Sequence, residues 1–180
     1  KIICAYAGSS DKMHTDYLKA ARQMGRTIAE RSISLAYGAG STGVMGALAD
    51  GALEAAGEVI GVIPELFNTP QLMHNRLTRL EIVRTMHQRK ARLAEMADAF
   101  IALPGGYGTF EELFEILTWA QIGLHRKPVG LLNVRNYFDP LLAMIDHARR
   151  EGFIYEEHRQ LISVDEHPAA LLDALENHRY

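Results

Sequence analysis

The feature that most constrains the fold is a short apolar run that stops at a glycine-rich turn and gives way to a helical pattern. Residues 98–103 are apolar enough to form a buried strand. The next five residues, 104–108, read Pro-Gly-Gly-Tyr-Gly and break that strand sharply. Apolar side chains then recur from Phe110 to Leu117 at the i, i+3, i+4, i+7 spacing of an amphipathic helix. These segments predict a strand, a tight turn and a helix in succession.

The same alternation of strand and helix continues along the whole sequence, as in an α/β fold with a parallel sheet. Strands are expected at Ile2–Tyr6, Ser34–Tyr37, Glu58–Ile63, Glu81–Arg84, Asp98–Leu103, Pro128–Asn133 and Leu161–Val164. Helices are expected at Asp11–Arg31, Val44–Ala56, Met86–Ala97, from Thr109 onward, at Tyr137–Glu151 and at Pro168–Asn177. A chain of 180 residues favours one domain, residues 1–180. The predicted fold is a single-domain, Rossmann-like, doubly wound parallel sheet with helices on both faces.

Charge and composition narrow the possible partners and the compartment. A net charge of −3 does not favour nucleic-acid binding, and no apolar run is long enough to span a membrane. The first residues read as a strand and not as a signal peptide. Cys4 is the single cysteine, so no internal disulfide is possible, and its apolar surroundings favour simple core packing. A cytoplasmic protein is expected.

Three glycine-rich loops follow strands and are candidates for binding a phosphate or a sugar. They are Gly8–Ser10, Gly38–Gly46 and Pro104–Thr109. In a doubly wound sheet, ligands bind beyond the carboxyl ends of the strands, where these loops would meet. Glycines allow close approach of the backbone, and helix N-termini favour anions. A nucleotide-sized ligand is therefore expected.

One of these loops matches a dinucleotide fingerprint, but NAD binding is not expected. Residues 38–43 fit G-x-G-x-x-G after a strand. The fingerprint also needs an acidic residue at the end of the following strand to hold the ribose hydroxyls. Glu58 begins that strand instead of ending it, and Glu65 is a weak substitute.

Two carboxylates, Glu111 and Glu112, follow the third loop and admit two interpretations. Thr109 and Glu112 have the spacing of a capping box, and spacing alone favours this structural role. A phosphate-binding loop has no need of carboxylates, however, so they also indicate chemistry beside the phosphate. Glu115 lies one helical turn beyond Glu112, on the same face, where it would either bind ribose hydroxyls or face solvent.

A second segment, Thr85–Lys90, places two cations where a helix disfavours them. Thr85 and Gln88 form another capping box, so Arg89 and Lys90 lie in the first turns of a helix. Cations there oppose the helix dipole by about 0.3–1 kcal/mol each. A local rule broken without evident gain indicates function, although a solvated pair of charges is the commoner case.

Both segments resemble the LOG ("lonely guy") family of cytokinin-activating phosphoribohydrolases, often labelled lysine decarboxylases. Residues 104–112 match the family motif PGGxGTxxE, and residues 86–91 read MHQRKA as the family does. The segments 119–121 and 128–133 are also similar. The resemblance implies hydrolysis of the N-glycosidic bond of an N6-modified adenosine 5′-monophosphate, or of AMP. It also implies that Arg89 and Glu112 act together in catalysis, without a metal or a cofactor, and that the protein is a homodimer.

The substrate-binding residues expected from the loops and from the resemblance are Ser9, Gly40, Gly43, Met45, Lys90, Gly105, Gly106, Tyr107, Gly108, Thr109, Glu115 and Thr118. Trp119, Ile122 and Leu124 would either contact a second subunit or pack in the core.

Other reaction classes fit poorly, but a binding protein is a real alternative. The eight histidines show no metal-binding spacing, and no G-x-S-x-G elbow surrounds a serine. A 180-residue domain with few lysines is small for a pyridoxal enzyme, which argues against a decarboxylase. A non-catalytic carrier of a nucleotide or of molybdenum cofactor would use the same loops, with Glu112 serving only as a cap.

Overall fold

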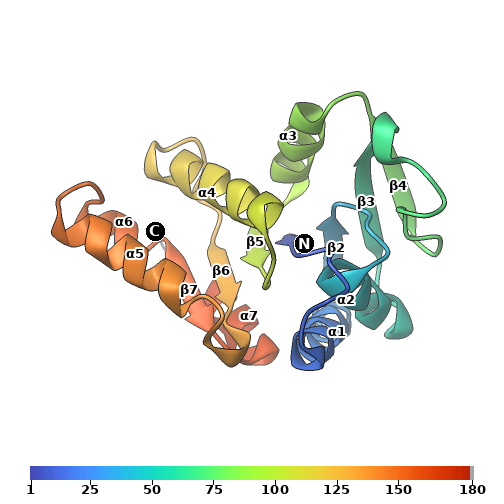
Figure 1. Ribbon diagram of the computed structural model, residues 1–180, viewed down its shortest axis with the longest axis horizontal. Coiled ribbons are helices and arrows are strands. Elements are labelled where there is room, and N and C mark those ends of the chain that lie inside the picture. The colour runs from blue at the N-terminus through green and yellow to red at the C-terminus, as the bar shows by residue number, and fades with distance from the viewer. Residues whose placement is uncertain (179–180) are drawn as a thin grey trace.

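The computed structural model describes residues 1–178, which form a parallel sheet with helices on both faces (Figure 1). The strands are β1 (Ile2–Tyr6), β2 (Ser34–Tyr37), β3 (Val59–Pro64), β4 (Arg79–Val83), β5 (Ala99–Ala102), β6 (Val129–Leu132) and β7 (Ile162–Asp165). They pair in the order β4-β3-β2-β1-β5-β6-β7, and every pair is parallel. The doubly wound fold expected from the sequence is confirmed.

The helices alternate with these strands along the chain. They are α1 (Thr15–Glu30), α2 (Gly43–Glu54), α3 (Met86–Met96), α4 (Tyr107–Gln121), α5 (Asp139–Arg150), α6 (Glu156–Arg159) and α7 (Pro168–Glu176). Two short 3₁₀ turns, Glu65–Phe67 and Val134–Asn136, lie in loops. The sequence pattern did not reveal α6, which is only one turn long and carries no apolar stripe.

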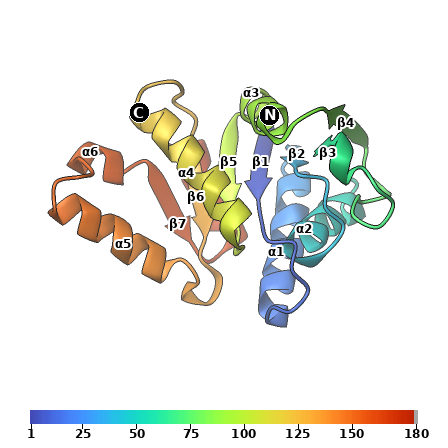
Figure 2. The same ribbon diagram turned by 45° about the horizontal axis from the view of Figure 1, so that its top comes forward.

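Alternate residues of the strands supply two cores, one on each face of the sheet. In β1, Ile3 and Ala5 pack with α1, α2 and α7, whereas Cys4 and Tyr6 pack with α3, α4 and α5. This follows from the two-residue period of a strand. Figures 1 and 2 show the two helical layers on either side of the sheet.

Four helices begin at residues other than those expected, and two of the shifts are small: α2 begins at Gly43 instead of Val44, and α5 at Asp139 instead of Tyr137. α1 begins at Thr15, not at Asp11, and the side chain of His14 caps it by accepting from the Asp16 amide at 3.2 Å. α4 begins at Tyr107, with Gly106 as its N-cap and no side-chain capping bond. The prediction of a capping box at Thr109 is therefore wrong, because Thr109 already lies inside the first turn.

The boundaries of two neighbouring strands, β3 and β4, also differ from those expected. β3 includes Pro64 as its last residue instead of stopping before it. Pro64 lies beside Val83 of β4, beyond the point where β2 ends, so its missing N–H leaves no bond unmade in β2. β4 is the edge strand and runs over residues 79–83 instead of the expected 81–84.

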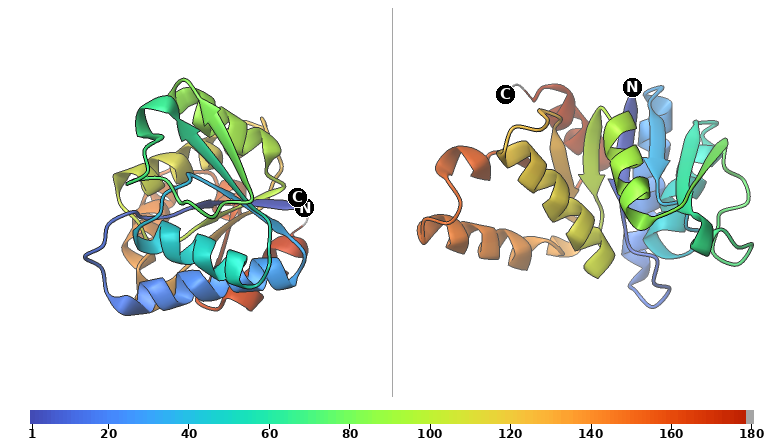
Figure 3. Two further views of the ribbon diagram at one scale, coloured as in Figure 1. Left: turned by 90° about the vertical axis from the view of Figure 1, so that its right-hand side faces the viewer. Right: turned by 90° about the horizontal axis from the view of Figure 1, so that it is seen from above.

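The chain reverses its direction of winding between β1 and β5, and the loops that follow these two strands lie together. The Gly8 amide donates to the Pro104 carbonyl at 3.1 Å. The loop after β2, Gly38–Gly46, joins them. The Met45 amide donates to the Gly8 carbonyl at 3.0 Å, and Thr42 Oγ1 donates to the Ser9 carbonyl at 2.8 Å. Figure 3 shows these loops at the end of the sheet opposite the start of β1. The expected convergence of the three glycine-rich loops is confirmed.

Helices α1 and α2 lie side by side and approach closely through glycines (Figure 2). A Cβ built on Gly25 would lie 2.0 Å from the Leu48 carbonyl oxygen. A Cβ on Gly51 would lie 1.9 Å from the Arg22 carbonyl oxygen. Backbone atoms cannot yield as a flexible side chain can, so these glycines set the distance between the two helices.

We expect Gly25→Ala to lower the free energy of unfolding by about 1–3 kcal/mol, because the added methyl group forces the two helices apart. Alanine is otherwise the better helix former by about 1 kcal/mol, so the sign of the change reports the packing. Chemical denaturation measures it. Gly108→Ala is the matched control, since a Cβ there meets nothing within 4 Å. Equal or greater stability in Gly25→Ala would contradict the close packing.

Candidate active site

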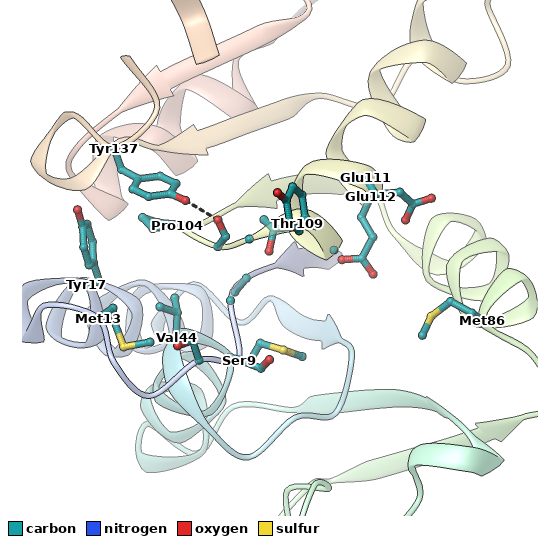
Figure 4. Close-up of a pocket in the computed structure, with 18 of the residues that line it drawn as sticks. Ser9, Met13, Tyr17, Val44, Met86, Pro104, Thr109, Glu111, Glu112 and Tyr137 are labelled. Atoms are coloured by element: carbon teal, nitrogen blue, oxygen red, sulfur yellow. Dashed lines mark hydrogen bonds between the residues drawn. The ribbon is translucent and has the colours of Figure 1, made fainter. Parts of the chain in front are cut away.

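A pocket of about 550 Å³ lies where the loops after β1 and β5 meet, within the size range of small-molecule sites. Figure 4 shows side chains from α1, α3, α4 and the loops converging on it. Its lining is Ala7, Gly8, Ser9, Ser10, Met13, Tyr17, Val44, Met45, Met86, Arg89, Pro104, Gly105, Gly106, Tyr107, Gly108, Thr109, Glu111, Glu112 and Tyr137. The position is the topological switch point at which doubly wound sheets bind their ligands.

The N-terminus of α4 forms one wall of this pocket and suits an anion. The first amides of a helix have no intrahelical acceptor, and the helix dipole adds partial positive charge there. Tyr107, Gly108 and Thr109 form this first turn, and no acidic residue lies in it. The turn therefore presents donors to the pocket.

The glycines of this wall serve two different purposes. A Cβ on Gly105 would lie 2.0 Å from Thr109 Oγ1, so the protein itself requires glycine there. A Cβ on Gly106 or Gly108 would meet nothing within 4 Å. Neither of these two residues adopts a positive φ. The protein gives no internal reason for glycine at 106 and 108, so the open space is available to a ligand.

Arg89 reaches the pocket from α3 across the ends of β2 and β3. Its Nε donates to the Val62 carbonyl at 3.1 Å. A Cβ on Gly38 would lie 1.7 Å from Arg89 Nη2, so only glycine leaves room for this guanidinium. One of the glycines of the G-x-G segment is thus explained by packing against an arginine.

Glu112 of α4 meets Arg89 in an ion pair with little exposure to solvent. Arg89 Nη1 donates to Glu112 Oε1 at 2.7 Å, and the two side chains are 12% and 11% exposed. Burial raises the pKa of the Glu112 carboxyl, an effect that the charge and hydrogen bond of Arg89 partly offset. Arg89 thus helps to keep a buried carboxylate ionised.

Lys90 pairs with the neighbouring carboxylates of α4. Its ammonium donates to Glu111 Oε1, and to Glu115 Oε1 at 3.0 Å. Burial works against the charged ammonium, but these two hydrogen bonds prevail and raise the pKa of Lys90. The unfavourable positions of Arg89 and Lys90 in the first turns of α3 are thereby explained, since each cation meets a carboxylate of α4.

The capping interpretation of Glu112 is excluded by this geometry, and that of Thr85 is confirmed. The Glu112 carboxylate points to Arg89 and the pocket, while Gly106 caps α4. Thr85 Oγ1 accepts from the Gln88 amide at 3.1 Å. Gln88 Oε1 accepts in return from the Arg84 amide at 2.9 Å.

The structure brings most of the expected site residues to the pocket but places five elsewhere. Those at the pocket are Ser9, Met45, Arg89, Gly105, Gly106, Tyr107, Gly108, Thr109 and Glu112. Those outside its lining are Gly40, Gly43, Lys90, Glu115 and Thr118. Gly43 has a φ of 64°, and its Cβ would lie 2.2 Å from the Ser10 carbonyl oxygen, so it serves the junction between loops. Thr118 Oγ1 donates to the Phe114 carbonyl at 2.7 Å within α4.

Several residues of the pocket carried no signal in the sequence. Met13 lies in the loop before α1, Tyr17 lies in α1, and Tyr137 lies in the loop after β6. Their roles depend on which side chains the sheet order brings together, and no local spacing encodes this. Met86 belongs to the segment that the cations Arg89 and Lys90 made notable, but no sequence pattern predicts that its side chain lines the pocket.

The part of the chain that the structure describes contains neither a metal-binding cluster nor a membrane-spanning helix. Among residues 1–178, no three His, Cys, Asp or Glu side chains are grouped to hold a metal ion. No helix in that range is both long and apolar enough to cross a bilayer.

We expect Arg89→Met to make protein stability depend on pH through Glu112. Without Arg89 the pKa of the buried carboxyl rises further, so the folded state keeps a proton that the unfolded state has lost. Stability then falls as pH rises between the ordinary glutamate pKa and this raised value, by up to about 1.4 kcal/mol per pH unit. Denaturation of the variant from pH 5 to 8 measures the slope.

The control is the double variant Arg89→Met with Glu112→Gln, which removes the titrating group while keeping the side-chain size. The difference in stability between the double and the single variant should grow with pH. Parallel stability curves for the two variants would contradict a buried, titrating Glu112.

Solved structures of other proteins share this fold. The molybdenum cofactor binding protein of Rippkaea orientalis superposes with a TM-score of 0.74 at 23% identity, over 97% of this chain and 94% of that chain. The molybdenum cofactor carrier protein of Chlamydomonas reinhardtii gives 0.73 at 23% identity, over 97% and 95%. At this identity the likeness concerns the fold alone.

Proteins with higher sequence identity to this chain indicate its family as well as its fold. A family described as "possible lysine decarboxylase" matches residues 45–175. A cytokinin riboside 5′-monophosphate phosphoribohydrolase of Rhodococcoides fascians is 49% identical over 91% of this chain and 83% of its own length. One of Arabidopsis thaliana is 49% identical over 90% and 75%. A probable one of Oryza sativa is 46% identical over 99% and 84%. With the glycine loop and the Arg89–Glu112 pair in one pocket, these matches place the chain in the LOG family of cytokinin riboside 5′-monophosphate phosphoribohydrolases.

Proposed function

We infer that this chain hydrolyses the N-glycosidic bond of cytokinin riboside 5′-monophosphates, which are N6-modified forms of AMP. Water adds to C1′ of the ribose while the bond from C1′ to N9 of the base breaks and the base takes up a proton. The products are the free base and ribose 5-phosphate. The related chains of Rhodococcoides fascians and Arabidopsis thaliana carry this activity in their names.

The observation that carries this inference is the buried pair of Arg89 and Glu112 beside the anion-binding turn. A loop that only held a nucleotide would need the amides of residues 106–109 but not a desolvated carboxylate next to them. Here the carboxylate lines the same pocket as the turn. Figure 4 shows Glu112 directed into the pocket from α4.

The 5′-phosphate is proposed to bind at the N-terminus of α4. The amides of the first turn and the open space at Gly106 and Gly108 support this placement. Ser9 lines the pocket on the side of β1 and can donate its hydroxyl. The phosphate then fixes one end of the substrate, which helps to orient the glycosidic bond.

Glu112 is proposed to act beside C1′. Cleavage of a glycosidic bond builds positive charge on the sugar, in an oxocarbenium-like transition state. A carboxylate held near C1′ stabilises that charge or orients the attacking water. Low exposure of the Glu112 side chain strengthens its electrostatic effect, because the local dielectric is lower than that of water.

Arg89 is proposed to hold Glu112 ionised and correctly oriented. Two hydrogen bonds hold its guanidinium, one from Nε to the Val62 carbonyl and one from Nη1 to Glu112 Oε1. The positive charge offsets the effect of burial on the Glu112 pKa. The same guanidinium lies at the pocket wall, where it is placed to assist departure of the base.

A carrier of molybdenum cofactor or of a nucleotide is the weaker alternative. It finds support in the folds of two solved proteins, but those are 23% identical to this chain, against 49% for named phosphoribohydrolases. A role of Glu112 as a mere cap would have favoured a carrier, and the structure excludes that role.

We also propose that residues 1–180 form one domain that acts as a cytoplasmic homodimer. Ile122 and Leu124, just after α4, are 62% and 66% exposed, which leaves an apolar surface for a second subunit. The pairing of all the strands of residues 1–178 in one sheet supports a single domain. Light scattering at micromolar concentration tests the dimer.

We expect Glu112→Gln to abolish release of the base while nucleotide binding survives. The amide keeps the shape of the side chain but cannot stabilise positive charge on the ribose. Chromatography of free base from AMP and from isopentenyladenosine monophosphate measures turnover, and calorimetry measures binding. Near-normal turnover by this variant would refute the catalytic role, whereas binding without turnover by the unmodified protein would favour the carrier.

We expect Gly108→Ala to raise the KM for nucleoside 5′-monophosphates about tenfold or more without loss of stability. The methyl group meets no protein atom, so it hinders only a ligand that approaches the turn. Steady-state kinetics with AMP measures the effect. Inhibition by free adenine, which has no phosphate, is the control and should not change. An unaltered KM for AMP would show that the phosphate binds elsewhere.

A further inference from the structure

Two successive residues before Tyr137 adopt a backbone conformation that L-amino acids disfavour. Arg135 has a φ of 55° and Asn136 a φ of 58°. Asparagine tolerates this left-handed region, but arginine has no such tendency. Strained backbone of this kind tends to occur near functional sites, where the surrounding structure maintains it.

Side chains around this turn hold it in place. Asn133 Oδ1 accepts from the Phe138 amide at 2.7 Å, and Asn133 Nδ2 donates to Asp139 Oδ1 at 2.8 Å. Arg135 Nη1 donates to Asp16 Oδ2 of α1 at 2.9 Å. The turn is therefore fixed to both α5 and α1.

The turn directs Tyr137 into an aromatic cluster beside the anion-binding loop. The Tyr137 ring stacks on Phe110 of α4, with centroids 6.5 Å apart and planes 12° apart. The rings of Tyr17 and Phe138 meet it edge-on, at 5.8 Å and 5.1 Å. With the ring fixed on three sides, the hydroxyl has a defined position.

That hydroxyl donates a hydrogen bond to the carbonyl oxygen of Gly105, drawn as a dashed line in Figure 4. The peptide unit so held joins Gly105 to Gly106. Glycine on both sides of a peptide unit makes its rotation easy, because neither residue has a Cβ to restrict φ and ψ. Without a partner for its carbonyl, this unit would be free to turn.

The orientation of this peptide unit decides which dipole faces the ligand. In a trans peptide the C=O and N–H groups point in opposite directions, and the chain contains no cis bond among residues 1–178. With the Gly105 carbonyl held by Tyr137, the Gly106 N–H points away from Tyr137. A reversed unit would turn a carbonyl oxygen toward the same side, which repels an anion.

We propose that Tyr137 is a positioning residue for substrate binding, which locks the Gly105–Gly106 peptide unit so that the Gly106 amide is available to the 5′-phosphate. The strained turn at Arg135–Asn136 aims its hydroxyl. The inference rests on the proposed function, because it assigns the phosphate of a nucleoside 5′-monophosphate to this loop. Tyr137 acts through the loop and not on the reacting atoms.

The test is Tyr137→Phe, which keeps the ring and removes only the hydroxyl. We expect the dissociation constant of ribose 5-phosphate and the KM for AMP to rise about five- to twentyfold, the range for loss of one hydrogen bond near a charged ligand. The kcat should change by less than about twofold, because Glu112 and Arg89 are untouched. Inhibition by free adenine should stay the same. Tyr155→Phe, at a 65% exposed tyrosine of the loop before α6, is the matched control.

Amide NMR of the ligand-free protein gives a readout that a general structural role would not move. The Gly106 resonance should shift or broaden in Tyr137→Phe, while resonances of the distant sheet stay in place. Equal affinity for ribose 5-phosphate would overturn the proposal, as would a similar loss for free adenine. A weaker affinity with an unchanged Gly106 resonance would also overturn it, because the hydroxyl would then contact the ligand directly.

Two variants at Asn136 test the role of the turn. Asn136→Gly accommodates a φ of 58° and should keep the affinity for ribose 5-phosphate, whereas Asn136→Val disfavours that φ and should weaken it as Tyr137→Phe does. Wild-type affinity in Asn136→Val would refute the aiming role. Calorimetry with ribose 5-phosphate needs no turnover, so a protein that binds it but does not release base would refute the proposed function and leave this inference standing.

Discussion

The ion pair between Arg89 and Glu112 is the interaction on which the arrangement of the site depends. It joins α3 to α4 over the carboxyl ends of β2 and β3, with both side chains largely removed from solvent. Burial of a charge is unfavourable unless a partner compensates it, so each residue needs the other. The pair brings a carboxylate and a cation to the wall of a pocket. Their electrostatic effect on a ligand is stronger there than that of a solvated pair, because the local dielectric is lower than that of water.

The glycines around this pair show how the backbone is shaped to fit the site. Gly38 leaves the space that the guanidinium of Arg89 occupies, and Gly105 allows Thr109 to pack against the loop. A Cβ added at Gly106 or Gly108 would have no other part of the protein within 4 Å. The first two glycines are explained by protein packing, whereas the last two border open space that we propose a ligand fills. Only the tertiary structure separates these two purposes, since all four residues are identical in the sequence.

Charge compensation across α3 and α4 also leaves the helix N-terminus available. Lys90 donates a hydrogen bond to Glu111, and Arg89 donates one to Glu112. Neither carboxylate therefore folds back on the first turn of α4. The amides of that turn have no intrahelical acceptor, and the turn lines the pocket. Tyr137 adds a further constraint from the far side of the loop by holding the Gly105 carbonyl. A turn with the free amides that suit an anion and the carboxylate proposed to act in catalysis can in this way occupy the same helix.

Patterns in the sequence were enough to predict the parallel α/β fold, the three converging loops, the two charged segments and the family. Strand and helix periods, glycine-rich turns and the PGGxGTxxE motif are local signals, and these features depend on local order. These patterns did not predict that α4 begins at Tyr107, that Lys90 turns to Glu111 and Glu115, or that Tyr137 meets the loop after β5. Those contacts join residues 21 to 32 positions apart. Only the order of the strands and the packing of the helices bring such residues together, because a local pattern carries no information about which distant side chain will compensate a buried charge.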